Sequence, residues 1–172
     1  MRLIICGGVC VGKTLFSNWL GAIHELPVIH LDDLYWYGNW NHISRTELIE
    51  RVENILQGKK EWIIEGNYPE VMNIFVDENT SIIYMDIGLI CGIYRVIKRS
   101  FDPERKGVPV NVKGGGNIKE PFCELLVCFM KSQMKKKKVL KTFAMKEDIF
   151  LIRQSRKFGE MHIKIKLLSN KH

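Results

Sequence analysis

The sequence lacks the features that mark disulfide-stapled, zinc-binding and membrane-spanning proteins. Its five cysteines are an odd number and include no C-x-x-C pair, which fits reduced thiols in a cytoplasmic protein better than a disulfide framework or a zinc site. The longest mainly apolar stretch is about nine residues, whereas a helix that crosses a bilayer needs about 20. We therefore expect a cytoplasmic protein with no membrane partner.

What the chain does contain is typical of a globular domain. Its 172 residues are 46% hydrophobic and 26% charged, enough to bury one core, so we expect a single domain over residues 1–172. The net charge of +7 is uneven, because residues 1–86 carry 6 basic and 12 acidic side chains and residues 87–172 carry 20 and 7. A basic half indicates an anionic partner, and from charge alone a nucleotide, a nucleic acid and an acidic lipid all fit.

Short apolar runs alternate along the chain with segments of helical periodicity. Because strands buried on both faces are almost continuously apolar, this order predicts a three-layer α/β/α sandwich around a five-stranded, largely parallel sheet. The expected strands are residues 2–6, 27–31, 61–65, 81–86 and 148–152. The expected helices are residues 13–23, 44–58 (opened by a capping box at Ser44 to Glu47), 89–99 and 120–143, with a short final helix from about Arg156.

The first expected strand runs into a loop that matches the pattern G-x-x-x-x-G-K-[ST] at every fixed position. Such a loop binds phosphates, because its glycines let successive backbone N–H groups point inward and the helix after it adds partial positive charge. Lys13 is expected to reach the β- and γ-phosphates of a nucleotide, and the Thr14 hydroxyl is expected to bind Mg²⁺. The residues expected to bind the nucleotide here are Gly7, Gly8, Val9, Cys10, Val11, Gly12, Lys13, Thr14 and Leu15.

Acidic residues follow three further strands. The carboxyl ends of parallel strands meet at one edge of the sheet, which is where ligands bind. Glu65 is placed to hold Mg²⁺ through water together with Thr14, and Asp32 is placed to orient an acceptor hydroxyl or to take its proton. Each carboxylate could instead be a helix cap or a loop carboxylate, which is the interpretation we favour for Asp33 and Asp86.

Phosphoryl transfer also needs cations around the migrating group, because its catalysis is mostly positioning and charge stabilisation. Arg95 and Arg99 are spaced i, i+4 on the expected helix, directly before a segment with two prolines and four glycines over residues 101–118. A mobile lid there, at about residues 100–118, would carry the arginines onto the phosphates and exclude water. A solvated basic face is the alternative. The apolar side of this helix is expected to comprise Ile90, Ile93, Tyr94 and Ile97.

Two further segments are more specific than the phosphate loop. Residues 30–36 read H-L-D-x-L-x-W and residues 62–68 read W-I-I-x-G-N-Y. With these motifs the chain resembles the adenylate-kinase-like P-loop kinases, and more closely the bacterial topology modulation proteins. The same resemblance extends to residues 82–86, 95–99, 135–138 and 151–155, so it covers nearly the whole chain in order.

The resemblance implies the strand order 2-3-1-4-5, Mg²⁺ with ATP, and an arginine-bearing lid. It also implies that Asp32 and Asn67 face the acceptor, and that the loop after the fifth strand, Arg153 to Arg156, lies beside the adenine, which makes Arg153 a nucleotide contact. Two departures are that Glu65 stands where the family usually has aspartate, and that the lid is less rich in arginine. Tyr68 and Trp36 are further expected acceptor contacts. The aromatic residues Tyr35, Trp36, Tyr37 and Trp40 either stack on the acceptor or cover the sheet edge as core.

A run of lysines, at 131, 135–138 and 141, puts six positive charges into eleven residues. Four consecutive lysines cannot share one helix face, so part of the run must face solvent. A solvated face is the interpretation we favour, and contact with nucleic acid phosphates is the alternative.

These features together predict a kinase that transfers the γ-phosphoryl group of Mg-ATP to a small acceptor bearing a hydroxyl or a phosphate, such as a nucleoside or a nucleotide. We expect it to act as a monomer or a homodimer. A nucleotide-dependent DNA-binding protein that modulates DNA topology is the alternative, and an NTPase switch without an acceptor is a weaker third hypothesis.

Overall fold

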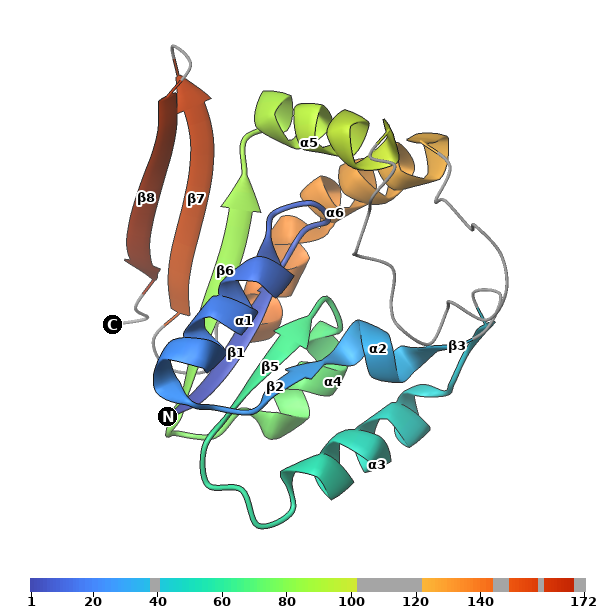
Figure 1. Cartoon of the computed structure of the whole chain (residues 1–172), viewed down its shortest axis with the longest axis vertical. Helices are drawn as coiled ribbons and strands as arrows, with labels where there is room; N and C mark the ends of the chain where they lie inside the picture. The colour runs from blue at the N-terminus through green and yellow to red at the C-terminus, as the bar shows by residue number, and fades with distance from the viewer. Residues whose placement is uncertain (38–40, 102–121, 144–148, 158–159, 169–172) are drawn as a thin grey trace.

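The computed structural model describes residues 1–37, 41–101, 122–143, 149–157 and 160–168, with side chains as far as Ile152. A six-stranded sheet forms its centre, in the order β2-β5-β1-β6-β7-β8, and Figure 1 shows helices on both sides of it. The first five strands in this order run parallel, and β8 runs antiparallel to β7. The strands are β1 Arg2–Gly7, β2 Val28–His30, β5 Trp62–Gly66, β6 Thr80–Ile87, β7 Ile149–Lys157 and β8 Glu160–Leu168.

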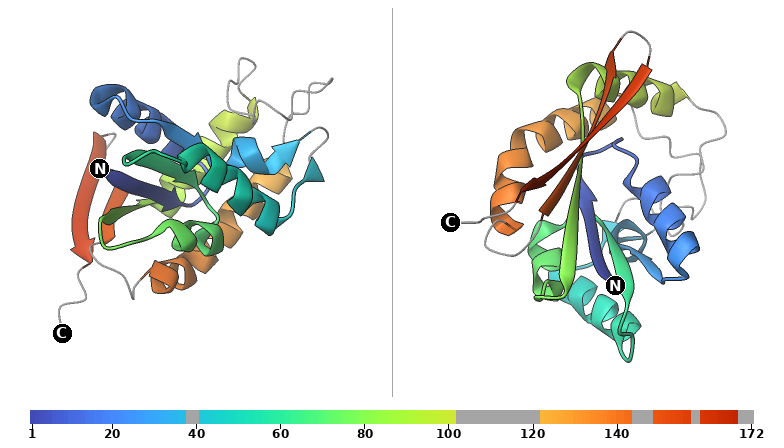
Figure 2. Two further views of the ribbon diagram at one scale, coloured as in Figure 1. Left: turned by 90° about the horizontal axis from the view of Figure 1, so that it is seen from below. Right: turned by 90° about the vertical axis from the view of Figure 1, so that its left-hand side faces the viewer.

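This architecture confirms the predicted α/β/α sandwich. In chain order, the five parallel strands lie as 2-3-1-4-5, the order that the resemblance implies. The sheet differs in one detail, because β8 adds a sixth strand at the edge beside β7, as Figure 2 also shows.

The C-terminal hairpin corrects two predictions. No helix begins at Arg156, because the chain continues along β7 to Lys157 and returns as β8. Residues 161–167 alternate apolar and polar side chains, which is the period of a strand and the signal that the predicted final helix overlooked. For the same reason Arg153 does not lie in a loop: it belongs to β7, where its backbone pairs with Asp86 of β6 and Lys164 of β8. The loop predicted at Arg153 to Arg156 is therefore wrong, and a nucleotide contact by Arg153 stays a prediction.

Four helices lie close to their predicted ranges, and shorter elements join them. Ser44 caps the second of the four, since its hydroxyl accepts a hydrogen bond from the Glu47 backbone N–H at 3.1 Å. These helices are α1 Lys13–His24, α3 Arg45–Leu56, α5 Leu89–Phe101 and α6 Phe122–Phe143. The shorter elements are α2 Leu31–Tyr35, the hairpin β3 Trp36–Tyr37 with β4 Asn41–His42, α4 Pro69–Met72 and the 3₁₀ turn Asn73–Phe75.

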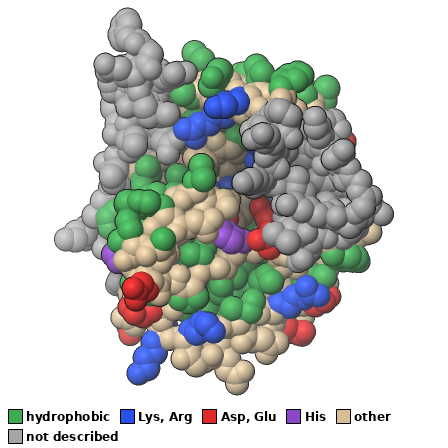
Figure 3. Space-filling view, in the orientation of Figure 1, with side chains coloured by type: hydrophobic (Ala, Val, Ile, Leu, Met, Phe, Trp, Pro, Cys, Tyr) green, Lys and Arg blue, Asp and Glu red, His purple; other side chains and the backbone are tan. Residues whose placement is uncertain are grey.

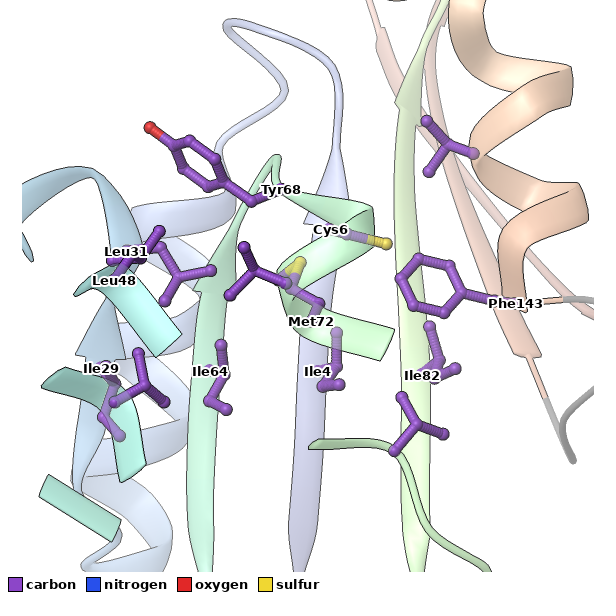
Figure 4. Packing of buried hydrophobic residues seen from close by; sticks show 14 of the residues in the cluster. Ile4, Cys6, Ile29, Leu31, Leu48, Ile64, Tyr68, Met72, Ile82 and Phe143 are labelled. Atoms are coloured by element: carbon purple, nitrogen blue, oxygen red, sulfur yellow. The ribbon is translucent and has the colours of Figure 1, made fainter. Parts of the chain in front are cut away.

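The sheet separates two hydrophobic clusters, because successive residues of a strand point to opposite faces. Ile4 of β1 packs in the cluster under α3, α4 and the end of α6, where Figure 4 shows Met72 and Phe143 over the strands. Ile5, the next residue, packs in the cluster under α1, α5 and the beginning of α6. Each fully buried aliphatic side chain contributes about 1.5–3 kcal/mol to folding, so both faces help to hold the sheet.

Helix α5 is rotated relative to the prediction. Of its expected apolar side, Ile90, Tyr94 and Ile97 are exposed, whereas the buried residues are Cys91, Gly92 and Val96. A Cβ at Gly92 would lie only 2.0 Å from Cζ of Phe129 in α6, so the glycine allows the two helices to pack closely on this face. The same rotation places Arg95 and Arg99 beside Cys10 of the phosphate loop.

Two other predictions concern the lid and the membrane. Apart from residues 100 and 101, which end α5, the predicted lid at about 100–118 lies outside the described residues. Within the described part, no helix has the length and apolar character needed to cross a membrane.

Candidate active site

A cleft of about 1190 Å³ opens at the carboxyl ends of the central strands. Ligand sites usually measure about 300–1,000 Å³, so the cleft has room for more than one small ligand. Figure 3 shows acidic and histidine side chains gathered in the hollow at the centre of this face. The predicted site residues that line the cleft are Val9, Cys10, Val11, Gly12, Lys13, Thr14, Leu15, Asp32, Trp36, Glu65, Asn67, Tyr68, Arg95 and Arg99.

The first two glycines of the phosphate loop are not among the residues that line the cleft. A Cβ at Gly7 would lie 2.2 Å from the Met85 carbonyl oxygen of β6, and a Cβ at Gly8 would lie 2.8 Å from Ser132 Oγ of α6. Both positions therefore let neighbouring elements approach the loop closely and support it. A phosphate contact by their backbone stays a prediction.

The rest of the loop joins β1 directly to α1, which is the strand–loop–helix context that the motif requires. Gly12 adopts a left-handed conformation at φ 92° where the helix begins, a conformation that glycine reaches without strain. Lys13 Nζ donates a hydrogen bond to the Gly8 carbonyl oxygen at 2.8 Å. The ammonium group thus lies across the loop, together with the positive end of α1.

The predicted metal-binding pair is in contact. Thr14 Oγ1 donates to Glu65 Oε2 at 3.3 Å, and the Glu65 side chain is only 3% exposed. A hydroxyl and a carboxylate are oxygen donors of the kind that Mg²⁺ prefers, and Mg²⁺ is commonly held by one or two such groups plus phosphates and water. In the described part of the chain, no three His, Cys, Asp or Glu side chains are grouped to hold a metal. The residues fit a Mg²⁺ ion that is held largely by nucleotide phosphates.

His30 is a member of this group to which the sequence analysis gave no role. Its Nδ1 lies 2.9 Å from Glu65 Oε2, and this hydrogen bond is the main cause that raises the pKa of His30 above its ordinary value of 6.5. The only signal in the sequence was its place in the motif before Asp32. The contact itself depends on the pairing of β2 with β5, which sets His30 opposite Glu65.

On the other side of the cleft lies Asp32, in the short helix α2. Tyr68 donates a hydrogen bond from its hydroxyl to Asp32 Oδ1 at 2.7 Å. The Asp32 side chain is exposed to the cleft, but protein atoms surround it on most sides, and this partial desolvation raises the pKa of its carboxyl above 3.8. Burial, followed by the nearby Asp32 charge, also raises the pKa of Tyr68. Trp36 and Asn67 line the cleft around this pair.

The aromatic residues differ in their surroundings, and stacking on an acceptor stays a prediction. Tyr35 packs against the hydrophobic core and stacks on His42 with ring centroids 4.9 Å apart. Trp36 lines the cleft and meets His42 edge-on at 5.6 Å. Tyr37 is exposed, and Trp40 lies outside the described residues. The Arg45 guanidinium lies 5.3 Å from the centre of the Tyr68 ring and so stabilises this wall of the cleft.

The two predicted arginines contact the phosphate loop from α5. Arg95 Nη1 donates to the carbonyl oxygens of Cys10 and Val11 at 3.3 and 3.2 Å. Arg99 Nη1 lies 3.9 Å from Cys10 Sγ. The alternative of a solvated basic face is therefore wrong for these two residues, because both line the cleft beside the loop.

Helix α6 forms a wall that the motifs did not reveal. Glu124, Leu125 and Cys128 line the cleft, and Lys136 forms an ion pair with the buried carboxylate of Asp86 at the end of β6. Asp86 is thus partnered within the fold, and one lysine of the basic run has a structural role. The cleft-lining residues absent from the predicted set are Phe16, Trp19, His42, Met85, Glu124, Leu125 and Cys128.

No family model matches the sequence, and no curated protein matches it closely. Among solved structures, a shikimate kinase from Bacteroides thetaiotaomicron has a TM-score of 0.51 at 14% identity, covering 88% of this chain and 86% of that kinase. An uncharacterized protein from Eubacterium ventriosum ATCC 27560 also has a TM-score of 0.51, at 15% identity, covering 90% of this chain and 89% of that one. The chain has the P-loop kinase fold. Identity this low shows the fold alone.

Proposed function

We propose that the protein is an ATP-dependent phosphotransferase that moves the γ-phosphoryl group of Mg-ATP to a small acceptor. One observation carries the proposal: the phosphate loop and the Asp32 carboxylate line the same cleft. Asp32 is bonded by Tyr68 and has Trp36 and Asn67 around it in the cleft, so the site offers an acceptor a hydrogen-bond partner and a surface for its body. This arrangement favours a kinase over an NTPase switch.

The phosphate side supplies positive charge to the transferring group. The backbone N–H groups of Gly7–Thr14 and the Lys13 ammonium would hold the β- and γ-phosphates, as such loops do. Arg95 and Arg99 would leave their present contacts at Cys10 and Val11 for the migrating phosphoryl oxygens. Thr14 and Glu65 would hold Mg²⁺, which when bound neutralises phosphate charge.

The acceptor side supplies orientation. Asp32, held by the Tyr68 hydroxyl, would accept a hydrogen bond from the acceptor hydroxyl and direct its oxygen at the γ-phosphorus. The new P–O bond forms as the bond to the β–γ bridging oxygen breaks, ADP leaves, and the hydroxyl proton passes to Asp32 or through it to water. Trp36 offers a ring surface to an acceptor such as a nucleoside or a nucleotide.

We further propose that the protein belongs with the bacterial topology modulation proteins and acts in the cytoplasm. The motifs at residues 30–36 and 62–68 support this, and both line or border the cleft. Arg153 would contact the nucleotide from strand β7, where its backbone pairs with that of Asp86.

The deciding experiment is ATP turnover with a panel of nucleosides, nucleotides, sugars and other small hydroxyl compounds, with Lys13→Ala as the control. We expect ADP and one phosphorylated acceptor to form in equal amounts, and neither to form with Lys13→Ala. If ATP binds to the wild type through Lys13 but no acceptor is phosphorylated, the kinase proposal fails while nucleotide binding stands.

A DNA-binding role keeps one specific observation in its favour. Lys131, Lys135, Lys137, Lys138 and Lys141 are exposed on α6, although Lys136 is paired with Asp86. Gel-shift affinity at two salt concentrations, with and without ATP, tests this role, because phosphate contacts make binding strongly dependent on salt. Absence of binding at physiological salt would remove it.

A further inference from the structure

His30 and Glu65 lie side by side because of strand pairing. The parallel register of β2 and β5 sets the two residues opposite each other, so their side chains share one face of the sheet. His30 Nδ1 lies 2.9 Å from Glu65 Oε2, and His30 Nε2 lies 3.0 Å from Asn18 Oδ1. The imidazole therefore bridges the carboxylate and helix α1.

Helix α1 contacts both His30 and Glu65. Thr14 and Asn18 are spaced i, i+4 and share one face of that helix. Thr14 contacts Glu65 and Asn18 contacts His30, so two residues of the helix rest on two residues of the sheet. Glu65 and His30 each contact two of the other three side chains, and Thr14 and Asn18 each contact one.

Both hydrogen bonds hold the same carboxylate oxygen of Glu65. An ionised carboxylate only accepts hydrogen bonds, so it is Nδ1 of His30 that carries the proton in this contact. Both His30 and Thr14 bond to Oε2 of Glu65, and Oε1 takes part in neither bond. Because the Glu65 side chain is 3% exposed, water cannot replace a lost partner freely, and loss of one would let the carboxylate turn or would leave it unpaired.

We propose that His30 is a positioning residue, which holds the Glu65 carboxylate in the orientation that binds the nucleotide-associated Mg²⁺ at Thr14. The inference rests on the proposed function, since it assumes that Mg²⁺ enters with the nucleotide. Groups that hydrogen-bond to metal ligands orient those ligands, and their removal usually lowers metal affinity by about 10- to 100-fold. The bond from Nδ1 to Glu65 carries the effect. The contact of Nε2 with the Asn18 amide holds the ring, because a ring that carries its proton on Nδ1 accepts at Nε2 from the NH₂ end of that amide.

Two amide substitutions separate the two ring nitrogens. The side-chain nitrogen of His30→Asn takes the place of Nδ1 and can still donate to Glu65. That of His30→Gln takes the place of Nε2 and keeps only the outer contact with Asn18, and His30→Ala keeps neither. The measurement is calorimetric affinity of the whole protein for ADP with Mg²⁺ and with excess EDTA, and the ratio of the two affinities reports the metal.

We expect His30→Ala and His30→Gln to lower this ratio about 10-fold and His30→Asn to keep it within about 2-fold of the wild type. ADP affinity in EDTA, which depends on the phosphate loop, should stay unchanged in all three variants. Equal ratios in the wild type and all variants would overturn the positioning role alone. An equal loss in EDTA, with a lowered melting temperature, would also overturn it in favour of a purely structural role. A wild type that shows no Mg²⁺-dependent ADP binding would overturn this inference, while the turnover experiment decides the proposed function separately.

Discussion

Helices α3 and α5 have nearly equal lengths, 12 and 13 residues, but α5 turns two arginines inward beside its buried residues Cys91, Gly92 and Val96. α3 turns Leu48 and Val52 into the core. α5 turns Arg95 and Arg99 inward to the phosphate loop and leaves Ile90 exposed at 86%. A helix far from the cleft follows its hydrophobic pattern, whereas a helix beside it is rotated to deliver charge.

The rotation of α5 has an identifiable support. Gly92 lets the Phe129 ring of α6 lie where a Cβ would be, so α5 gains close packing from a small residue rather than from its large apolar ones. The cost of exposing Ile90 and Tyr94 is the loss of their burial, roughly 1.5–3 kcal/mol for each such side chain. Hydrogen bonds from Arg95 to two loop carbonyls offset part of that loss.

The largest expected effect comes from removing the inward charge of α5. Arg95→Ala should lower kcat for phosphoryl transfer about 100- to 1,000-fold, because a guanidinium that stabilises transition-state charge contributes on this scale. Lys98→Ala is the matched control, since it removes the same charge from an exposed position of the same helix. Steady-state kinetics on the acceptor found by turnover checks the pair, and equal effects of both substitutions would contradict a specific role for Arg95.

In α3 the large effect should instead be on stability. Leu48→Ala should lower the free energy of unfolding by about 2–5 kcal/mol, because it leaves a cavity at a fully buried position. Urea unfolding followed by circular dichroism measures the change. Nucleotide affinity of the folded variant should stay at the wild-type value, and a strong loss of affinity would show that α3 does affect the cleft.

A smaller effect is expected where α5 meets α6. Gly92→Ala should destabilise the protein by about 1–2 kcal/mol, since overpacking against Phe129 outweighs the better helix propensity of alanine. The new methyl group would push α5 away from α6, so the kinetics should suffer along with stability. A stabilised variant would mean that the close approach at Gly92 is not what sets the rotation of α5.

The smallest effect is expected on the outward face of α5. Ile90→Gln should change the free energy of unfolding by no more than about 0.5 kcal/mol, as is usual for exposed positions. A loss above about 2 kcal/mol in the same unfolding experiment would indicate that this face is covered in solution, and would break the contrast with Leu48.

The sequence carried most of the fold because its signals are local. The phosphate loop, the capped start of α3 and the five apolar strand runs each lie within a few neighbouring residues, and the strand order followed from the resemblance. The helix predicted from Arg156 was wrong although residues 161–167 alternate as a strand does. That signal was present and was missed.

Other features depend on contacts between distant segments, which a single sequence does not reveal. The apolar side predicted for α5 follows hydrophobicity, but Gly92, Phe129 and the phosphate loop decide its rotation. His30 joins Glu65 only through the register of β2 and β5. Lys136 finds Asp86 fifty positions away, which no charge pattern within the lysine run indicates.

Helix α6 links the hydrophobic clusters on the two faces of the sheet. It contributes Leu125 and Phe129 to the cluster on one face and Val139 and Phe143 to the cluster on the other. Its 22 residues form a rod about 33 Å long that passes the edge of the phosphate loop at Ser132. Loosening of either cluster therefore loosens the support of the other, so the two faces should melt in one cooperative transition.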